Sequence, residues 1–128
     1  MLSQFSIRHL PPLLVAAATT FGGLLPLFNA EYAIREFGLP QRVADSRSAQ
    51  SVMITSAARI SAIGHALFLF YFQGKLVEFD TLLSVLGHVG LIDGYVCWRE
   101  GVPGKGLFRA VSGLVIATWG WLRLTSSV

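Results

Sequence analysis

The sequence predicts an all-α protein, a transmembrane four-helix bundle that forms a single domain over residues 1–128. Three observations lead to this prediction. Hydrophobic residues make up 53% of the chain and charged residues only 13%, with a mean hydropathy of +0.60; soluble domains carry about 25% charged residues. Four apolar runs are each long enough to cross a hydrocarbon core of about 30 Å. Segments rich in polar residues, glycine and proline separate these runs.

The first predicted span covers about residues 10–30. Pro11 and Pro12 suit the first turn of a helix, where a backbone N–H has no helical partner. A cleaved signal peptide is the alternative, but the run is too long and Phe28 stands where a small residue precedes a cleavage site. A polar connector follows, in which Phe37-Gly38-Leu39-Pro40 marks the end of a helical stretch.

The other three spans follow in close succession, at about residues 52–73, 77–98 and 106–124. Four spans place both termini on one side of the membrane. The basic residues on the loop side are Arg35, Arg42, Arg47, Arg99 and Lys105, and those on the terminal side are Arg8, Lys75 and Arg123. The larger number of basic residues on the loop side predicts that the loops are cytoplasmic and that the termini lie outside or in the lumen. We expect an integral protein of the endoplasmic reticulum or another endomembrane.

Small residues recur at helical spacing in three of the spans. Such residues let membrane helices approach closely, because packing and hydrogen bonds must replace the missing hydrophobic drive. We therefore expect these faces to point inward. They comprise Ala57, Ser61 and Gly64 in the second span, Ser84, Gly87, Gly90 and Gly94 in the third, and Gly106, Ala110, Gly113, Ala117 and Gly120 in the fourth.

Three charged residues inside the spans are the predicted centre of function. A charge at membrane depth is costly, and it usually faces a protein interior, a partner charge or water. At about 1.5 Å rise per residue, Arg59 and Asp93 lie about 10 and 9 Å from the loop-side face, and Arg109 about 5 Å. We therefore expect Arg59, Asp93 and Arg109 to cluster. The alternative is a structural ion-pair network in which Arg109 only reaches the headgroups.

Two histidines, His65 and His88, lie near the predicted mid-bilayer, and the unperturbed imidazole pKa of about 6.5 suits general acid or base catalysis. A structural hydrogen bond is the alternative for each. Two arginines and one aspartate leave a surplus positive charge, which favours an anionic or oxygen-rich ligand. We predict Arg59, Asp93, His88 and His65 as catalytic residues, and Arg109, Tyr95 and Glu31 as substrate-binding residues.

Other classes of site lack a matching pattern. His65, His88 and Asp93 do not have the close spacing typical of a metal site, and no glycine-rich nucleotide motif is present. We therefore expect neither a metal nor a cofactor. The net charge of +3 forms no basic stripe, so no nucleic-acid partner is expected. The single cysteine, Cys97, excludes an internal disulfide.

Nearly the whole chain resembles a family of small integral membrane proteins classed as a domain of unknown function. The motif positions of that family fall on Phe37-Gly38-Leu39-Pro40, Arg59 and Asp93. The family occurs in fungi and bacteria, often within fungal secondary-metabolite gene clusters. Its histidine near the start of the fourth span is replaced here by Phe108-Arg109. The architecture is also similar to that of the four-helix anthrone oxidases of fungal polyketide pathways, which work without a cofactor.

The resemblance and the charged residues together predict a small membrane enzyme of secondary metabolism. Its substrate would be a lipophilic polyketide or terpenoid intermediate, changed by isomerisation, cyclisation or cofactor-free oxidation. Asp93 or His88 would remove a proton, and Arg59 with Arg109 would stabilise the resulting anion. The alternative function is a non-catalytic scaffold, partner subunit or small-molecule carrier. A homo-oligomer, or a complex with a pathway enzyme, is compatible with both.

Overall fold

The computed structural model describes residues 6–127, and every regular element in that range is a helix. Four helices are long: α1 (Leu10–Gly22), α5 (Arg47–Phe72), α6 (Leu76–Arg99) and α7 (Pro103–Trp121). The short elements are the 3-10 turn η2 (Ile7–His9) and the helices α2 (Leu25–Phe28), α3 (Ala30–Phe37) and α4 (Gln41–Ala44). The all-α prediction is confirmed.

Three helical stretches are long and apolar enough to cross a membrane: Ile7–Phe28, Arg47–Phe72 and Leu76–Arg99. They match the first three predicted spans, and they make the protein compatible with placement in a membrane. The fourth predicted span corresponds to α7, which has 19 residues. Within residues 6–127, α7 is not among the helices that meet this measure of length and apolarity.

The first predicted span is less regular than expected. α1 ends at Gly22. Pro26, four residues later, has no backbone N–H, so it cannot donate the next hydrogen bond of a continuous helix. Asn29 then starts α3, since its side chain accepts a hydrogen bond from the Tyr32 N–H at 3.0 Å. The second span begins at residue 47 rather than near 52, because the Ser46 side chain caps α5.

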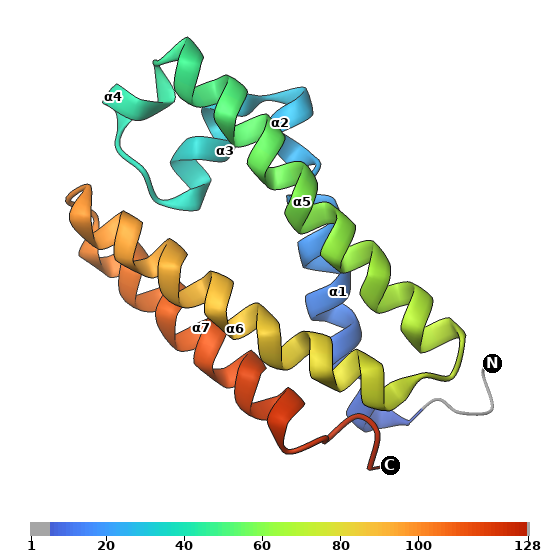
Figure 1. The fold of residues 1–128 in the computed structure, drawn as a ribbon. Helices are drawn as coiled ribbons and strands as arrows, with labels where there is room; N and C mark the ends of the chain where they lie inside the picture. The colour runs from blue at the N-terminus through green and yellow to red at the C-terminus, as the bar shows by residue number, and fades with distance from the viewer. Residues whose placement is uncertain (1–5, 128) are drawn as a thin grey trace.

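The long helices form two pairs (Figure 1). α6 packs along α7, and α1 packs along α5. α5 and α6 are joined by a short turn around Gly74, and the two pairs converge near that turn. The first and last described residues, 6 and 127, lie there as well, whereas α5 and α6 diverge toward the end that carries α3 and α4. We call these the terminal end and the loop end of the molecule.

The predicted small-residue faces are the faces along which the helices pack. A Cβ added to Gly90 of α6 would lie 2.8 Å from Gly113 Cα of α7, which is too close for two carbon atoms. A Cβ on Gly64 of α5 would overlap Thr20 of α1. This prediction is therefore confirmed: the small residues permit the close approach within both helix pairs.

The apolar core lies at the terminal end, where the pairs converge. Its buried members are Ala16, Leu67, Tyr71, Phe79, Leu83 and Leu86. They come from α1, α5 and α6, and the Tyr71 and Phe79 rings meet edge-on with centroids 6.1 Å apart. Many large apolar side chains elsewhere are exposed, among them Leu14, Leu107, Phe108, Val115 and Trp121. Apolar surface of this extent suits contact with lipid better than with water.

Candidate functional site

Asp93 shares a face of α6 with two residues of the apolar core. It follows Phe79 and Leu86 at intervals of seven residues, about two helical turns, so that the three side chains share one face. Phe79 and Leu86 pack in the core, and Asp93 continues their row where α5 and α6 diverge (Figure 1). The carboxylate is half-buried, and within residues 6–127 it forms no hydrogen bond and no ion pair.

Arg109 of α7 lies close enough to Asp93 for their opposite charges to attract each other, although no ion pair forms between them within residues 6–127. Its Nε donates a hydrogen bond of 2.7 Å to the carbonyl oxygen of Phe37. Its guanidinium carbon also lies 4.0 Å from the centroid of the Phe37 ring. These contacts hold the guanidinium group in place through one of its five N–H donors, and leave the others for a second acceptor.

Gly38 fits closely between α6 and α7, and this explains why the motif Phe37-Gly38-Leu39-Pro40 has a glycine at this position. Its φ of +117° is a conformation that other residues rarely adopt. A Cβ at this position would lie 2.6 Å from Lys105 Cβ and 3.1 Å from Cys97 Sγ. The buried Cys97 thiol donates a hydrogen bond of 3.5 Å to the Phe37 carbonyl. Because Cys97 is one helical turn past Asp93, the loop 37–40 contacts α6 one turn from Asp93, on the side of the loop end.

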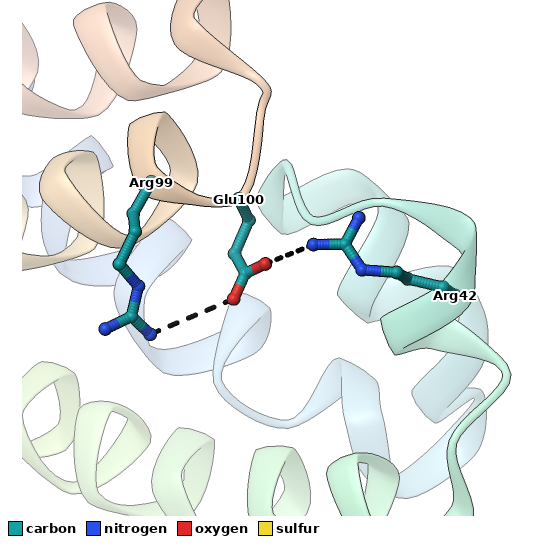
Figure 2. A network of polar contacts seen from close by, with 3 residues as sticks. All are labelled: Arg42, Arg99 and Glu100. Atoms are coloured by element: carbon teal, nitrogen blue, oxygen red, sulfur yellow. Dashed lines mark hydrogen bonds and ion pairs between the residues drawn. The ribbon is translucent and has the colours of Figure 1, made fainter.

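An ion-pair network joins α4 to the turn between α6 and α7 (Figure 2). Glu100 caps the end of α6 and pairs with Arg42 of α4. Its other carboxylate oxygen lies 3.8 Å from an Arg99 nitrogen. The Arg42 side chain is 65% exposed and that of Glu100 25% exposed, so this contact lies at the surface of the loop end.

Arg59 is not part of the Asp93 site, which corrects the expected cluster of three charges. It lies exposed on α5, donates a hydrogen bond of 3.0 Å to Thr55 O in its own helix, and forms no ion pair within the described part of the chain. With Ser51 it lines a shallow depression of about 290 Å³. Arg59 is two residues from Ala57, hence about 200° around the helix from the face that packs on α1.

The other predicted site residues form no hydrogen bond or ion pair with Asp93 within residues 6–127. His65 of α5 and His88 of α6 are exposed on their helices. Tyr95 is 56% exposed, with its ring centroid 6.4 Å from that of Trp98. Glu31 of α3 accepts a hydrogen bond of 3.1 Å from the Gln41 side chain. Across residues 6–127, no three His, Cys, Asp or Glu side chains are placed to hold a metal ion.

A second, unpredicted polar cluster is buried at the terminal end. The fully buried His9 ring contacts the Tyr71 hydroxyl through Nδ1 and the Thr125 carbonyl oxygen through Nε2, each at 3.0 Å. Because a carbonyl can only accept, Nε2 donates, and Nδ1 of a neutral ring accepts from the hydroxyl. His9 thereby joins the start of α1 to α5 and to the segment 122–127 that follows α7.

Asp80 of α6 holds the same segment from the other side. It is fully buried, and Oδ2 accepts a hydrogen bond of 2.8 Å from the Ser126 N–H. The Trp119 indole N–H donates to the Thr125 hydroxyl at 2.9 Å. Oδ1 of Asp80 is buried and has no hydrogen-bond partner within residues 6–127. The only sequence signal for this cluster was an aspartate near the start of an apolar helix.

These features define a small all-helical protein with apolar helices of membrane-spanning length and charged residues within its long helices. Comparison with known families agrees with this class. The chain belongs to the family described as Domain of unknown function (DUF4267), whose model matches residues 16–123. The match includes the loop 37–40, Asp93 and Arg109, and it confirms the resemblance to a domain of unknown function. No curated protein and no solved structure matches the chain.

Proposed function

We propose that the chain is an integral membrane protein with four spans, α7 being the fourth. The support comes from the packing of α7 against α6 at both ends. A Cβ on Gly94 would lie 2.6 Å from the Gly106 carbonyl oxygen at the loop end, and one on Gly120 would overlap the Asp80 carbonyl at the terminal end. A helix that accompanies a spanning helix over its length shares its depth in the bilayer. The termini then lie on one side, and an endomembrane such as the endoplasmic reticulum suits the placement.

We further propose that this protein is an enzyme that transfers protons on a lipophilic substrate, with Asp93 as general base. The observation that carries this proposal is the half-buried Asp93 carboxylate, which has no hydrogen bond or ion pair within residues 6–127 although Arg109 lies near it. Ionisable residues inside membrane spans are costly, and they are usually retained for function. In this structure Phe37 holds the Arg109 guanidinium in a fixed position.

The proposed reaction begins with the transfer of a proton from the substrate to an Asp93 oxygen. The proton leaves a carbon next to a carbonyl group, and its electron pair moves onto the carbonyl oxygen to form an enolate. The free N–H donors of Arg109 stabilise that oxyanion. Return of the proton to another carbon gives isomerisation, attack on an internal electrophile gives cyclisation, and reaction with dioxygen gives cofactor-free oxidation. The resemblance to proteins of fungal gene clusters supports a polyketide or terpenoid substrate.

Deuterium exchange tests the proposal without knowledge of the natural substrate. Proteoliposomes in deuterated buffer receive a panel of lipophilic 1,3-diketones and phenolic ketones, and mass spectrometry measures deuterium incorporation. The protein should accelerate exchange for at least one compound, and Asp93→Asn should lower the rate by about 10²–10⁴, the usual contribution of a general base. Glu78→Gln is the matched control, because Glu78 is exposed at the other end of the same helix.

An equal rate in the Asp93→Asn variant would refute the catalytic role. If no compound exchanges and a pathway enzyme copurifies in stoichiometric amount, the scaffold or partner-subunit function replaces the enzyme. A homo-oligomer would be compatible with either result.

A further inference from the structure

The α6–α7 hairpin is attached to the rest of the chain at both of its ends, but by contacts of different kinds. At the terminal end it joins α5 through the buried core. The buried hydrogen bond that His9 donates to the Thr125 carbonyl oxygen, in the segment 122–127, adds to this attachment. At the loop end it is held by Phe37, which accepts from Cys97 and Arg109, and by the Arg42–Glu100 ion pair.

We propose that the loop-end contacts form the latch of a gate: the segment 37–44 separates from the α6–α7 hairpin and opens a path to Asp93. We define the latch as the contacts of Phe37 with Arg109 and Cys97, together with the Arg42–Glu100 ion pair. That a lipophilic substrate uses this path rests on the function proposed above. The opening of the latch is independent of that proposed function.

The difference in burial determines which end opens. Opening at the terminal end would have to expose the Phe79 and Leu83 side chains, which are almost completely buried, and would break the buried hydrogen bond between His9 and Thr125. The loop end has an exposed ion pair, and pairs of this kind contribute little to stability and are weakened by salt. The divergence of α5 and α6 toward the loop end also leaves the hairpin with less support there (Figure 1). Separation should therefore begin at the latch.

Opening of the latch uncovers Cys97 and Asp93 together. Cys97 is fully buried, it donates to the Phe37 carbonyl, and Gly38 lies directly against its sulfur atom. Asp93 lies one turn earlier on α6, and it acts electrostatically on Cys97. Any movement of the loop 37–40 that admits a reagent to the Cys97 sulfur also uncovers the loop end of the face that carries Asp93. Cys97 is the only cysteine of the chain, so its reactivity reports the position of the gate.

The test measures the rate at which N-ethylmaleimide modifies Cys97 in proteoliposomes. Arg42→Glu replaces the ion pair with repulsion, and the rate should rise about two- to fivefold, as expected for the loss of an exposed ion pair. Glu100→Arg should act in the same direction. The double variant Arg42→Glu/Glu100→Arg restores opposite charges and should bring the rate back toward that of the unmodified protein.

Arg35→Glu is the matched control, since Arg35 is exposed on α3 and forms no ion pair within residues 6–127. Thermal unfolding of each variant shows whether the whole fold has changed. A rate that stays constant in Arg42→Glu, or that rises equally in Arg35→Glu, overturns the gate. If the gate responds as expected while no ketone exchanges deuterium, the proposed enzyme fails and the gate stands.

Discussion

The two aspartates of α6 have different surroundings, and these suggest different roles. Asp80 is fully buried, and one of its oxygens accepts a hydrogen bond from Ser126. It thereby fixes a chain segment. Asp93 is half-buried, and its carboxylate makes no such contact within residues 6–127. A carboxylate that holds part of the fold is occupied, whereas one that is unpaired beside a fixed arginine can bind or react.

The first prediction at this scale compares Arg109→Ala with Arg59→Ala. Arg109→Ala removes a hydrogen bond from a charged donor to Phe37, so the free energy of unfolding should fall by about 1.5–3 kcal/mol. Arg59→Ala should change it by less than about 0.5 kcal/mol, because Arg59 is exposed and bonds only within its own helix. Unfolding in mixed detergent measures both. Equal losses would mean that Arg59 has a partner that the fold does not show.

A second prediction concerns the segment 122–127. Thr125→Val keeps the side-chain shape but removes the hydroxyl that accepts from Trp119, so a donor in the interior loses its acceptor. We expect a loss of about 1–3 kcal/mol in the same unfolding experiment. Thr118→Val is the control, because the Thr118 hydroxyl is exposed and bonds to Leu114 of its own helix. A similar cost for both variants would show that the Trp119 contact contributes nothing.

Sequence reasoning gave the depth of the charged residues along their helices, but it could not determine for all of them which side of the helix the side chain lies on. It placed Asp93 and Arg109 at the loop end, where the structure also brings them near one another. It failed for Arg59 because depth was considered without angle: Arg59 is out of register with the small-residue face of its helix. His9 and Thr125 are separated by 116 residues, and no local pattern predicts a contact at that separation.

At the scale of elements, helix existence was predicted well and helix ends less well. α6 spans residues 76–99 against a predicted 77–98, since apolar length alone determines its extent. α1 was predicted too long because Pro26 and the Asn29 cap interrupt an apolar run whose composition is nearly uniform. The packing faces followed directly from the spacing of glycine, alanine and serine.

The third prediction tests that packing. Gly90→Ala should lower the free energy of unfolding by about 1–3 kcal/mol, the usual cost of an overpacked core, because the new methyl group would meet the backbone of α7 at Gly113. Gly22→Ala adds the same methyl group where nothing lies within 4 Å, and it should be neutral or slightly stabilising. If Gly90→Ala unfolds like the unmodified protein, the α6–α7 contact is looser than described.

At the scale of the whole molecule, the number of spans decides on which side of the membrane each end lies. Three spans would separate the two ends, and four would place them together. Within residues 6–127, three helices are long and apolar enough to cross, whereas packing favours four spans. α7 contacts α6 from Gly94 to Asp80, so a membrane that covers α6 also covers the inner face of α7. The outer face of α7 exposes Leu107, Val111, Leu114 and Val115, as expected for a helix in contact with lipid.

Reporter tags should therefore give the same compartment at both ends of residues 1–128, on the luminal or exterior side. A tag inserted after Gly101, in the turn between α6 and α7, should report the opposite, cytoplasmic side, because the loops carry the larger number of basic residues. The inserted tag controls for passive leakage of the reporter. If the two ends report different compartments, α7 lies on the membrane surface. Its pairing with α6 would then have to form outside the bilayer, and Arg109 could not assist Asp93 at membrane depth.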